Sequence, residues 1–172
     1  MNRWALMVVG IGIVAQAATA FAETGTVQLQ GTVQGSTVQG QATLADTSEG
    51  LQVTVKVSGV APGSHGWHIH QFGTCGDAGN AAGGHYNPEG APHGFFPKDG
   101  HGKAHPGDMG NIEVKPDGSG ETTVTLPGVP VSSVAGRAII LHEKADDFGQ
   151  PTGNAGGRIG CGPIVLTKGP AT

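Results

Sequence analysis

The 172-residue sequence has few aromatic residues, few charged residues and only two cysteines. Aromatic residues make up 5% and charged residues 13% of the chain, and 9 lysines and arginines face 13 acids. So little positive charge does not favour nucleic acid as a partner. The low charge, combined with 37% hydrophobic residues, also argues against a solvated disordered chain. Glycine (32) and proline (11) are abundant instead, without a collagen period, which favours one compact domain rich in turns.

The one long apolar run lies at the N-terminus, where Met-Asn-Arg precedes residues 4–18 and an Ala-Phe-Ala exit at 20–22. This layout is typical of a secretory signal peptide. The run is short for a membrane span and has no stop-transfer flank, although an uncleaved anchor is the alternative. We expect residues 1–22 to be cleaved, and residues 23–172 to form one domain without a membrane partner.

Cys75 and Cys161 are the two cysteines. In an exported protein they suffice for one disulfide bond. Two free thiols or two metal ligands are the alternatives. The oxidising compartment favours the disulfide.

Short runs of alternating apolar residues dominate the rest of the chain. The clearest run is Leu51, Val53, Val55 and Val57, as expected for a half-buried strand. Eight such runs, separated by turn signals, predict an all-β fold, an antiparallel barrel or sandwich. They lie around residues 27–33, 38–44, 51–57, 67–69, 112–114, 124–126, 137–141 and 164–166.

Two segments, residues 72–110 and 143–157, are too long and irregular for hairpin loops. Long segments of this kind inside a compact domain are usually functional. Most of the 8 histidines lie between residues 65 and 105, in or beside the first segment. We therefore expect the chemistry of the protein to lie in these two loops.

His68 and His70 lie two residues apart in a predicted strand, so their side chains share one face. Trp67 and Ile69 would then face the apolar interior. Two imidazoles on a rigid strand form half of a metal site. His142 follows another apolar run and can supply a third imidazole from across the sheet.

A second group of ligand types lies in the first loop: His85, His93, His105 and Asp108. Three imidazoles and one carboxylate suit a tetrahedral zinc site. The spacing from His105 to Asp108 fits a tight turn that brings both ligands to one ion. A solvated loop that is rich in histidine is the alternative, but the two groups together argue against it.

Five motifs resemble those of copper/zinc superoxide dismutases, in the order of that family and over essentially the whole mature chain. The resemblance implies an eight-stranded Greek-key β-barrel or sandwich with two long functional loops. The motifs are His-Gly-Trp-His-Ile-His-Gln-Phe-Gly (65–73), Gly-Gly-His-Tyr-Asn-Pro (83–88), His-Pro-Gly-Asp-Met-Gly-Asn (105–111), Gly-Arg-Ala-Ile-Ile-Leu-His-Glu-Lys-Ala-Asp-Asp (136–147) and Gly-Asn-Ala-Gly-Gly-Arg-Ile-Gly-Cys-Gly (153–162).

The resemblance further implies one copper ion and one zinc ion per chain, which share a bridging histidine. The implied copper ligands are His68, His70, His85 and His142. The implied zinc ligands are His85, His93, His105 and Asp108. An all-imidazole site favours copper, and three histidines with one aspartate suit zinc, so the chemistry of the donors agrees with this division.

Further roles follow from the same resemblance. Asp146 matches an aspartate that accepts hydrogen bonds from one copper histidine and one zinc histidine. Arg158 matches an arginine that holds the incoming superoxide anion, and Thr152 matches the residue across the channel mouth. The disulfide between Cys75 and Cys161 would hold the first loop near this arginine. Two other histidines match no ligand position: His65 and His101.

The implied reaction is the dismutation of superoxide to dioxygen and hydrogen peroxide, with copper cycling between Cu(II) and Cu(I). Arg158 and His85 would be the catalytic residues. The signal peptide and the short spacing from His70 to Cys75 indicate a bacterial, periplasmic member. Bacterial and eukaryotic members pair through different surfaces, so a homodimer stays open. A periplasmic copper/zinc buffer or chaperone on the same fold, without turnover, is the alternative function.

Overall fold

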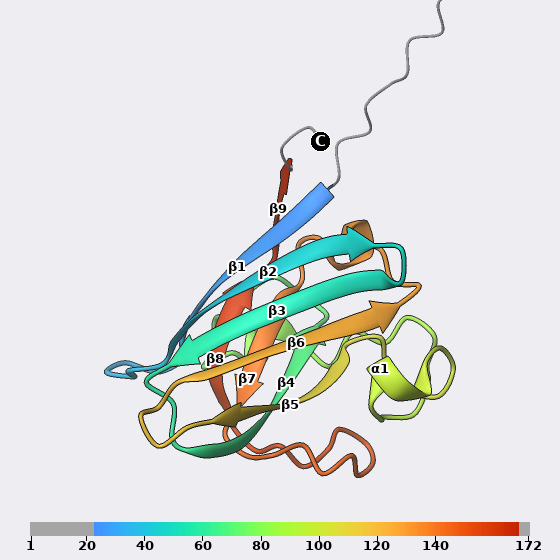
Figure 1. Cartoon of the computed structure of the whole chain (residues 1–172). Coiled ribbons are helices and arrows are strands. Elements are labelled where there is room, and N and C mark those ends of the chain that lie inside the picture. Colours follow the sequence, from blue (N-terminus) through green and yellow to red (C-terminus); the bar gives the residue numbers. More distant parts are fainter. Residues whose placement is uncertain (1–22, 169–172) are drawn as a thin grey trace, which may run out of the picture.

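The computed structural model describes residues 23–168, and nearly all regular structure in that range is β-strand (Figure 1). The prediction of a signal peptide lies outside the described residues. The strands are β1 (Glu23–Gly31), β2 (Gln39–Thr47), β3 (Gly50–Ser58), β4 (Gly63–His70), β5 (Asp108–Val114), β6 (Gly120–Pro127), β7 (Ala138–His142), β8 (Arg158–Pro163) and β9 (Val165–Lys168). The short helical turns are η1 (Asn80–Ala82), α1 (Phe96–Asp99) and η2 (Val131–Val134). Across residues 23–168, no helix has the length and apolar content needed to cross a membrane.

The strands form one closed antiparallel barrel. Their order is β2-β3-β6-β5-β4-β7-β8-β1-β9, and the additional pairing of β1 with β2 closes the sheet. The chain passes over β6 and β5 between β3 and β4, and over β5 and β4 between β6 and β7, which is a Greek-key arrangement. The predicted all-β barrel is confirmed.

The C-terminal strands differ from the prediction. The last expected run, residues 164–166, falls mostly in β9, which pairs with β1 beyond β8. The strand β8 was not expected, because its glycines interrupt the alternation of apolar side chains. At Gly162 the neighbouring strand approaches so closely that an added Cβ would overlap the carbonyl oxygen of Gln28. Packing with neighbouring strands therefore explains this segment better than local propensity does.

The barrel interior is apolar, and it fixes which way the histidines of β4 point. Trp67 and Ile69 belong to the buried core, and they lie opposite Leu141 and Ile139 of β7. Successive side chains in a strand point to opposite faces. The alternate side chains of β4, including His68, therefore lie on the outer face of the barrel.

Two long connections, drawn mostly as irregular loops in Figure 1, join these strands to their neighbours in the sheet. Residues 71–107 join β4 to β5, and residues 143–157 join β7 to β8. A disulfide bond between Cys75 and Cys161 ties the first loop to β8. The predicted disulfide is confirmed, and the loops bring distant parts of the sequence together beside β4.

Candidate metal centre

Three histidines meet on the outer face where β4 and β7 run side by side. His68 and His70 lie opposite Ile140 and Ala138 in the register of the two strands, and His142 ends β7 after an irregularity in its pairing with β8. The ring centroid of His142 lies 4.9 Å from that of His68 and 5.6 Å from that of His70. Period-2 alternation thus places His68 and His70 on one face, and the pairing of β4 with β7 brings His142 beside them.

His85 completes this group from the first loop. It forms an isolated β-bridge with His70, and the adjacent Tyr86 N–H donates to the carbonyl oxygen of Ile69 at 2.8 Å. Its ring stacks on that of His68 with a centroid separation of 4.1 Å. One ring nitrogen from each of the four histidines lies within 4.8 Å of the others. We call these four residues the four-histidine cluster.

The other side of His85 faces a second group, which comprises His93, His105 and Asp108. Asp108 Oδ1 lies 2.8 Å from His85 Nδ1 and 3.0 Å from His105 Nδ1, and the two nitrogens are 3.4 Å apart. Asp108 Oδ2 lies 2.8 Å from His93 Nδ1. Four ligands at about 2.0 Å from a zinc ion in a tetrahedron are roughly 3.3 Å apart, so these separations suit one ion. Backbone N–H groups of Gly94 and His105 donate to Oδ2 at 3.0 and 3.1 Å and fix the carboxylate.

Hydrogen bonds to backbone carbonyls fix the tautomer of two rings in the four-histidine cluster. His70 Nδ1 donates to the carbonyl oxygen of Gly83 at 2.9 Å, and His142 Nδ1 donates to that of Gly156 at 3.4 Å. A carbonyl oxygen can only accept, so the proton of each ring sits on Nδ1. Nε2 of both rings therefore keeps its lone pair.

Asp146 orients one ring of each group through hydrogen bonds to its carboxylate. His68 Nε2 lies 2.7 Å from Asp146 Oδ2, and His93 Nε2 lies 3.0 Å from Asp146 Oδ1. Both rings donate to the carboxylate, so Nδ1 of each ring faces its ligand group. Asn111 holds the aspartate in place, because its amide bonds both backbone groups of Asp146 at 2.9 and 2.7 Å.

Three of the nitrogens left with a lone pair are buried and have no hydrogen-bond partner: His68 Nδ1, His70 Nε2 and His142 Nε2. A buried polar atom without a partner costs about 1–3 kcal/mol. All three belong to the four-histidine cluster. A metal ion would supply the partners that these nitrogens lack, and the separations around Asp108 suit a second ion on the other side of His85.

The pKa values of the histidines support the same conclusion. Burial lowers the pKa of His70 to about 2, that of His142 to about 3 and that of His85 to about 4. These rings are neutral at pH 7 and ready to bind metal. Burial alone would raise the pKa of Asp108, but hydrogen bonds from three histidines hold it far below its usual range. Burial also opposes the charge on His93, but its two carboxylate partners raise its pKa to about 9, so a metal must displace a proton there.

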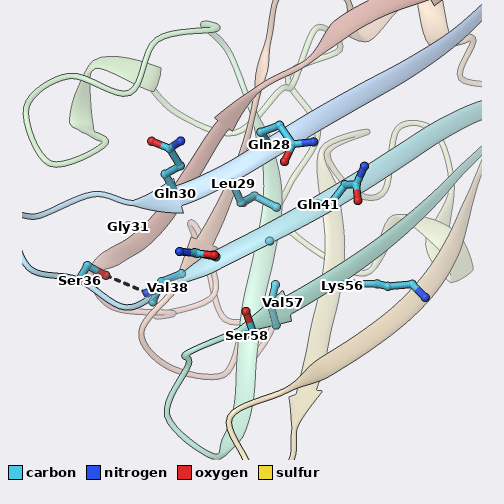
Figure 2. Close-up of a pocket in the computed structure, with 12 residues that line it drawn as sticks. Gln28, Leu29, Gln30, Gly31, Ser36, Val38, Gln41, Lys56, Val57 and Ser58 are labelled. Carbon is cyan, nitrogen blue, oxygen red and sulfur yellow. Dashed lines mark hydrogen bonds between the residues drawn. The ribbon is translucent and has the colours of Figure 1, made fainter.

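A cavity of about 190 Å³ opens beside the four-histidine cluster. Its lining includes His70, His85 and His142 together with Thr152 and Arg158. A larger hollow of about 640 Å³ lies over β1, β2 and β3, where its lining is mainly amide, hydroxyl and aliphatic side chains (Figure 2). That hollow has no histidine or acid among its described lining residues, so the smaller cavity, and not this hollow, gives access to the cluster.

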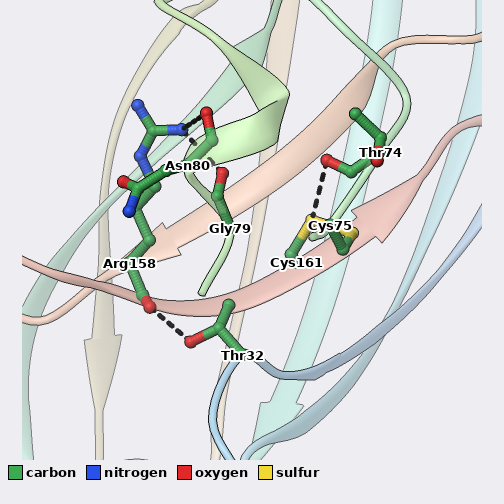
Figure 3. The surroundings of a disulfide bond; sticks show 7 residues. All are labelled: Thr32, Thr74, Cys75, Gly79, Asn80, Arg158 and Cys161. Atoms are coloured by element: carbon green, nitrogen blue, oxygen red, sulfur yellow. Dashed lines mark hydrogen bonds between the residues drawn. A yellow bond between two sulfur atoms is a disulfide. The ribbon is translucent and has the colours of Figure 1, made fainter. Parts of the chain in front are cut away.

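Arg158 is held at this cavity by the loop that the disulfide secures. Its Nη1 donates to the carbonyl oxygen of Gly79 and its Nη2 to that of Gly83, both at 2.7 Å. Figure 3 shows this side chain reaching the loop near the Cys75–Cys161 bond. Burial lowers the pKa of Arg158, but a guanidinium keeps its charge at pH 7. The cavity therefore has a fixed positive charge beside the four-histidine cluster.

Two histidines lie outside both groups. The ring nitrogens of His65 lie 2.8 Å from the carbonyl oxygens of His142 and Ala61, so both face backbone groups and neither faces a group of ligand atoms. His101 is half-exposed and bonds to Glu89. Neither belongs to a group of converging ligand atoms, in agreement with their lack of a matching ligand position.

Sequence reasoning missed three residues that shape the site. Asn111 holds Asp146, and Gln150 bonds the backbone of His93. Gly153, at φ +77°, lies so close to the Asp146 carboxylate that an added Cβ would overlap it. Amides and glycines are common in loops and carry no local signal of these contacts. Only the place of Asn111 at the end of the ligand-bearing motif 105–111 could have drawn attention to it.

A closed antiparallel barrel whose outer face carries two ligand groups joined by one histidine defines a candidate two-metal protein. The family model described as copper/zinc superoxide dismutase (SODC) matches residues 38–164, and the chain belongs to this family. Among solved structures, the chain is similar to one described as the clock protein EA4, with 30% identity and a TM-score of 0.74. That likeness covers 87% of this chain and 98% of the other. Superoxide dismutase activity is thus supported at the level of the family.

Proposed function

We propose that the protein is a superoxide dismutase that holds one copper ion and one zinc ion. The observation that carries this proposal is the pair of ligand groups that meet at His85, with buried ring nitrogens that have no other partner. A purely structural β-barrel would have no reason to bury these groups unpaired. A copper ion in the four-histidine cluster and a zinc ion beside Asp108 satisfy them.

The two nitrogens of His85 divide the metals between the groups. Its Nδ1 lies with the Asp108 carboxylate and would join His93 Nδ1 and His105 Nδ1 in holding zinc. Its Nε2 would face copper. The other copper ligands would be Nδ1 of His68 and Nε2 of His70 and His142. When bound, copper supplies the one-electron chemistry between Cu(II) and Cu(I) that dismutation of superoxide needs, whereas zinc has no second oxidation state.

The residues of the chain would handle the anion and the protons. Arg158 attracts superoxide through its fixed charge and holds it at the cavity, across from Thr152. His85 would take up a proton from water at Nε2 in the first half-reaction and give it to the peroxide product in the second, with water supplying the other proton.

The test is superoxide consumption by the purified protein after loading with one equivalent of each metal. We expect rapid consumption with both metals and none with zinc alone. Tight binding of both metals without consumption would instead support the alternative, a copper/zinc buffer or chaperone. Export to the bacterial periplasm stays a prediction of the signal layout and the resemblance, and pairing as a homodimer stays open. The disulfide agrees with an oxidising compartment.

A further inference from the structure

The second long loop reaches the zinc-side group through an amide side chain as well as through Asp146. Gln150 Oε1 accepts the backbone N–H of His93 at 3.0 Å, and Gln150 Nε2 donates to the carbonyl oxygen of His93 at 2.8 Å. One side chain therefore bonds both backbone groups of a single residue. Such a reciprocal pair fixes position and orientation together, because neither bond can rotate without breaking the other.

The neighbours of His93 show what this pair adds. Asn87 bonds both backbone groups of Ala91 at 2.9 and 3.0 Å, and the N–H of Gly94 donates to the Asp108 carboxylate. These contacts all lie within the first loop or with the start of β5. Gln150 is the contact that ties the backbone of His93 itself to residues 143–157.

The ring of His93 is held from the same loop. Its Nε2 lies 3.0 Å from Asp146 Oδ1, while its Nδ1 points to the Asp108 side. The backbone and the ring are thus fixed by two residues, four positions apart, on residues 143–157. Partners of this kind set the orientation of a metal ligand and so its affinity for the metal.

We propose that Gln150 is a positioning residue for His93, which couples the order of residues 143–157 to the retention of zinc. This inference rests on the proposed function, because it takes His93 as a zinc ligand. Loss of zinc should free the histidine and loosen both loops. Loss of the amide should, in turn, weaken the hold on zinc while leaving the barrel intact.

Two substitutions test whether the amide group of Gln150, and not only the volume of its side chain, holds His93. Gln150→Ala removes both bonds. Gln150→Glu keeps the size and the acceptor for the His93 N–H, but its carboxylate replaces a donor by a negative oxygen that faces the His93 carbonyl. Both variants should therefore lose the reciprocal pair. Gln52 is an exposed glutamine on β3, and Gln52→Ala and Gln52→Glu are the matched controls.

The experiment measures the rate at which a chelator removes zinc from the copper- and zinc-loaded protein. We expect release about 10-fold faster in both Gln150 variants and unchanged release in both Gln52 variants. A second readout replaces zinc by cobalt(II), whose visible absorption depends on ligand geometry. The bands should shift in the Gln150 variants, which a general loss of stability would not cause.

Three outcomes decide the inference. Faster release with shifted cobalt bands supports it. Unchanged release and unchanged bands, in variants of a protein that holds zinc and consumes superoxide, overturn this inference alone and leave the proposed function standing. Failure of the unsubstituted protein to hold zinc at all overturns both.

Discussion

Replacing both Cys75 and Cys161 by serine should destabilise the metal-free protein by about 4–5 kcal/mol at 25 °C. The disulfide joins residues 86 positions apart. In the chain-entropy model, a cross-link that closes a loop of this length removes conformations from the unfolded chain, and the estimate of about 4–5 kcal/mol follows from the loop length. The loss should be large because the entropy that the cross-link removes from the unfolded chain grows with the number of residues between the two cysteines.

The same change should also affect the cavity. Cys161 lies on β8 with Arg158, and Cys75 begins the stretch whose carbonyl oxygens at Gly79 and Gly83 hold the guanidinium. Opening the disulfide lets these carbonyls move away. The metal-loaded variant should therefore bind copper normally but consume superoxide more slowly.

Urea unfolding of the metal-free protein, followed by circular dichroism, measures the stability. Metal must be absent because binding to the folded state would add its own stabilisation. The unsubstituted protein under reducing conditions is the control. Reduction breaks the same disulfide bond but leaves both cysteine side chains in place. A loss of stability below about 2 kcal/mol, with an unchanged denaturant slope, would refute the loop-entropy reasoning.

Three further predictions follow from the site. Arg158→Glu should lower superoxide consumption at least about 10-fold at low ionic strength with copper and zinc contents unchanged; an equal rate would remove Arg158 from anion binding. Asp146→Asn should weaken retention of both metals about 10- to 100-fold in equilibrium dialysis, since the NH2 group that replaces one carboxylate oxygen is a donor and would face a ring N–H, and unchanged affinities would contradict that bridging role. The metal-free protein should lose on the order of 2–3 kcal/mol of stability between pH 7.5 and 5.5, with the raised pKa of His93 offsetting part of the loss. Its three histidines of lowered pKa stay neutral in the folded protein but take up protons below about pH 6.5 in the unfolded chain. Their contribution to stability is therefore present above that pH and is lost as the pH falls. Urea titrations at both pH values check this, and equal stabilities would contradict it. The three are His70, His85 and His142.

The alternation of apolar residues explains how much of the barrel could be predicted. Leu51 to Val57 alternate cleanly because β3 has one face in the core and one in water, and β3 lies where this pattern indicates. The strand β8 has no such pattern, because Gly160 and Gly162 leave room for neighbouring strands instead of filling the core. Local patterns describe strands that present side chains to a core, and they miss strands whose role is close backbone approach.

The site divides in the same way. Period-2 spacing was enough to place His68 and His70 on one face, because a strand sets the directions of its own side chains. The meeting of His85 with both groups depends on the path of a 37-residue loop, which no local rule describes, and only the resemblance pointed to it. The contact between Gln150 and His93 joins two loops, so neither segment carries a sign of it.

Anomalous X-ray diffraction at the copper and zinc absorption edges, from crystals of the metal-loaded protein, tests the central claim most directly. The account predicts two separate peaks, one on each side of the His85 ring. Copper should lie among His68, His70 and His142, and zinc should lie beside Asp108. A single metal bound at one side only, or two peaks that do not flank His85, would contradict the account.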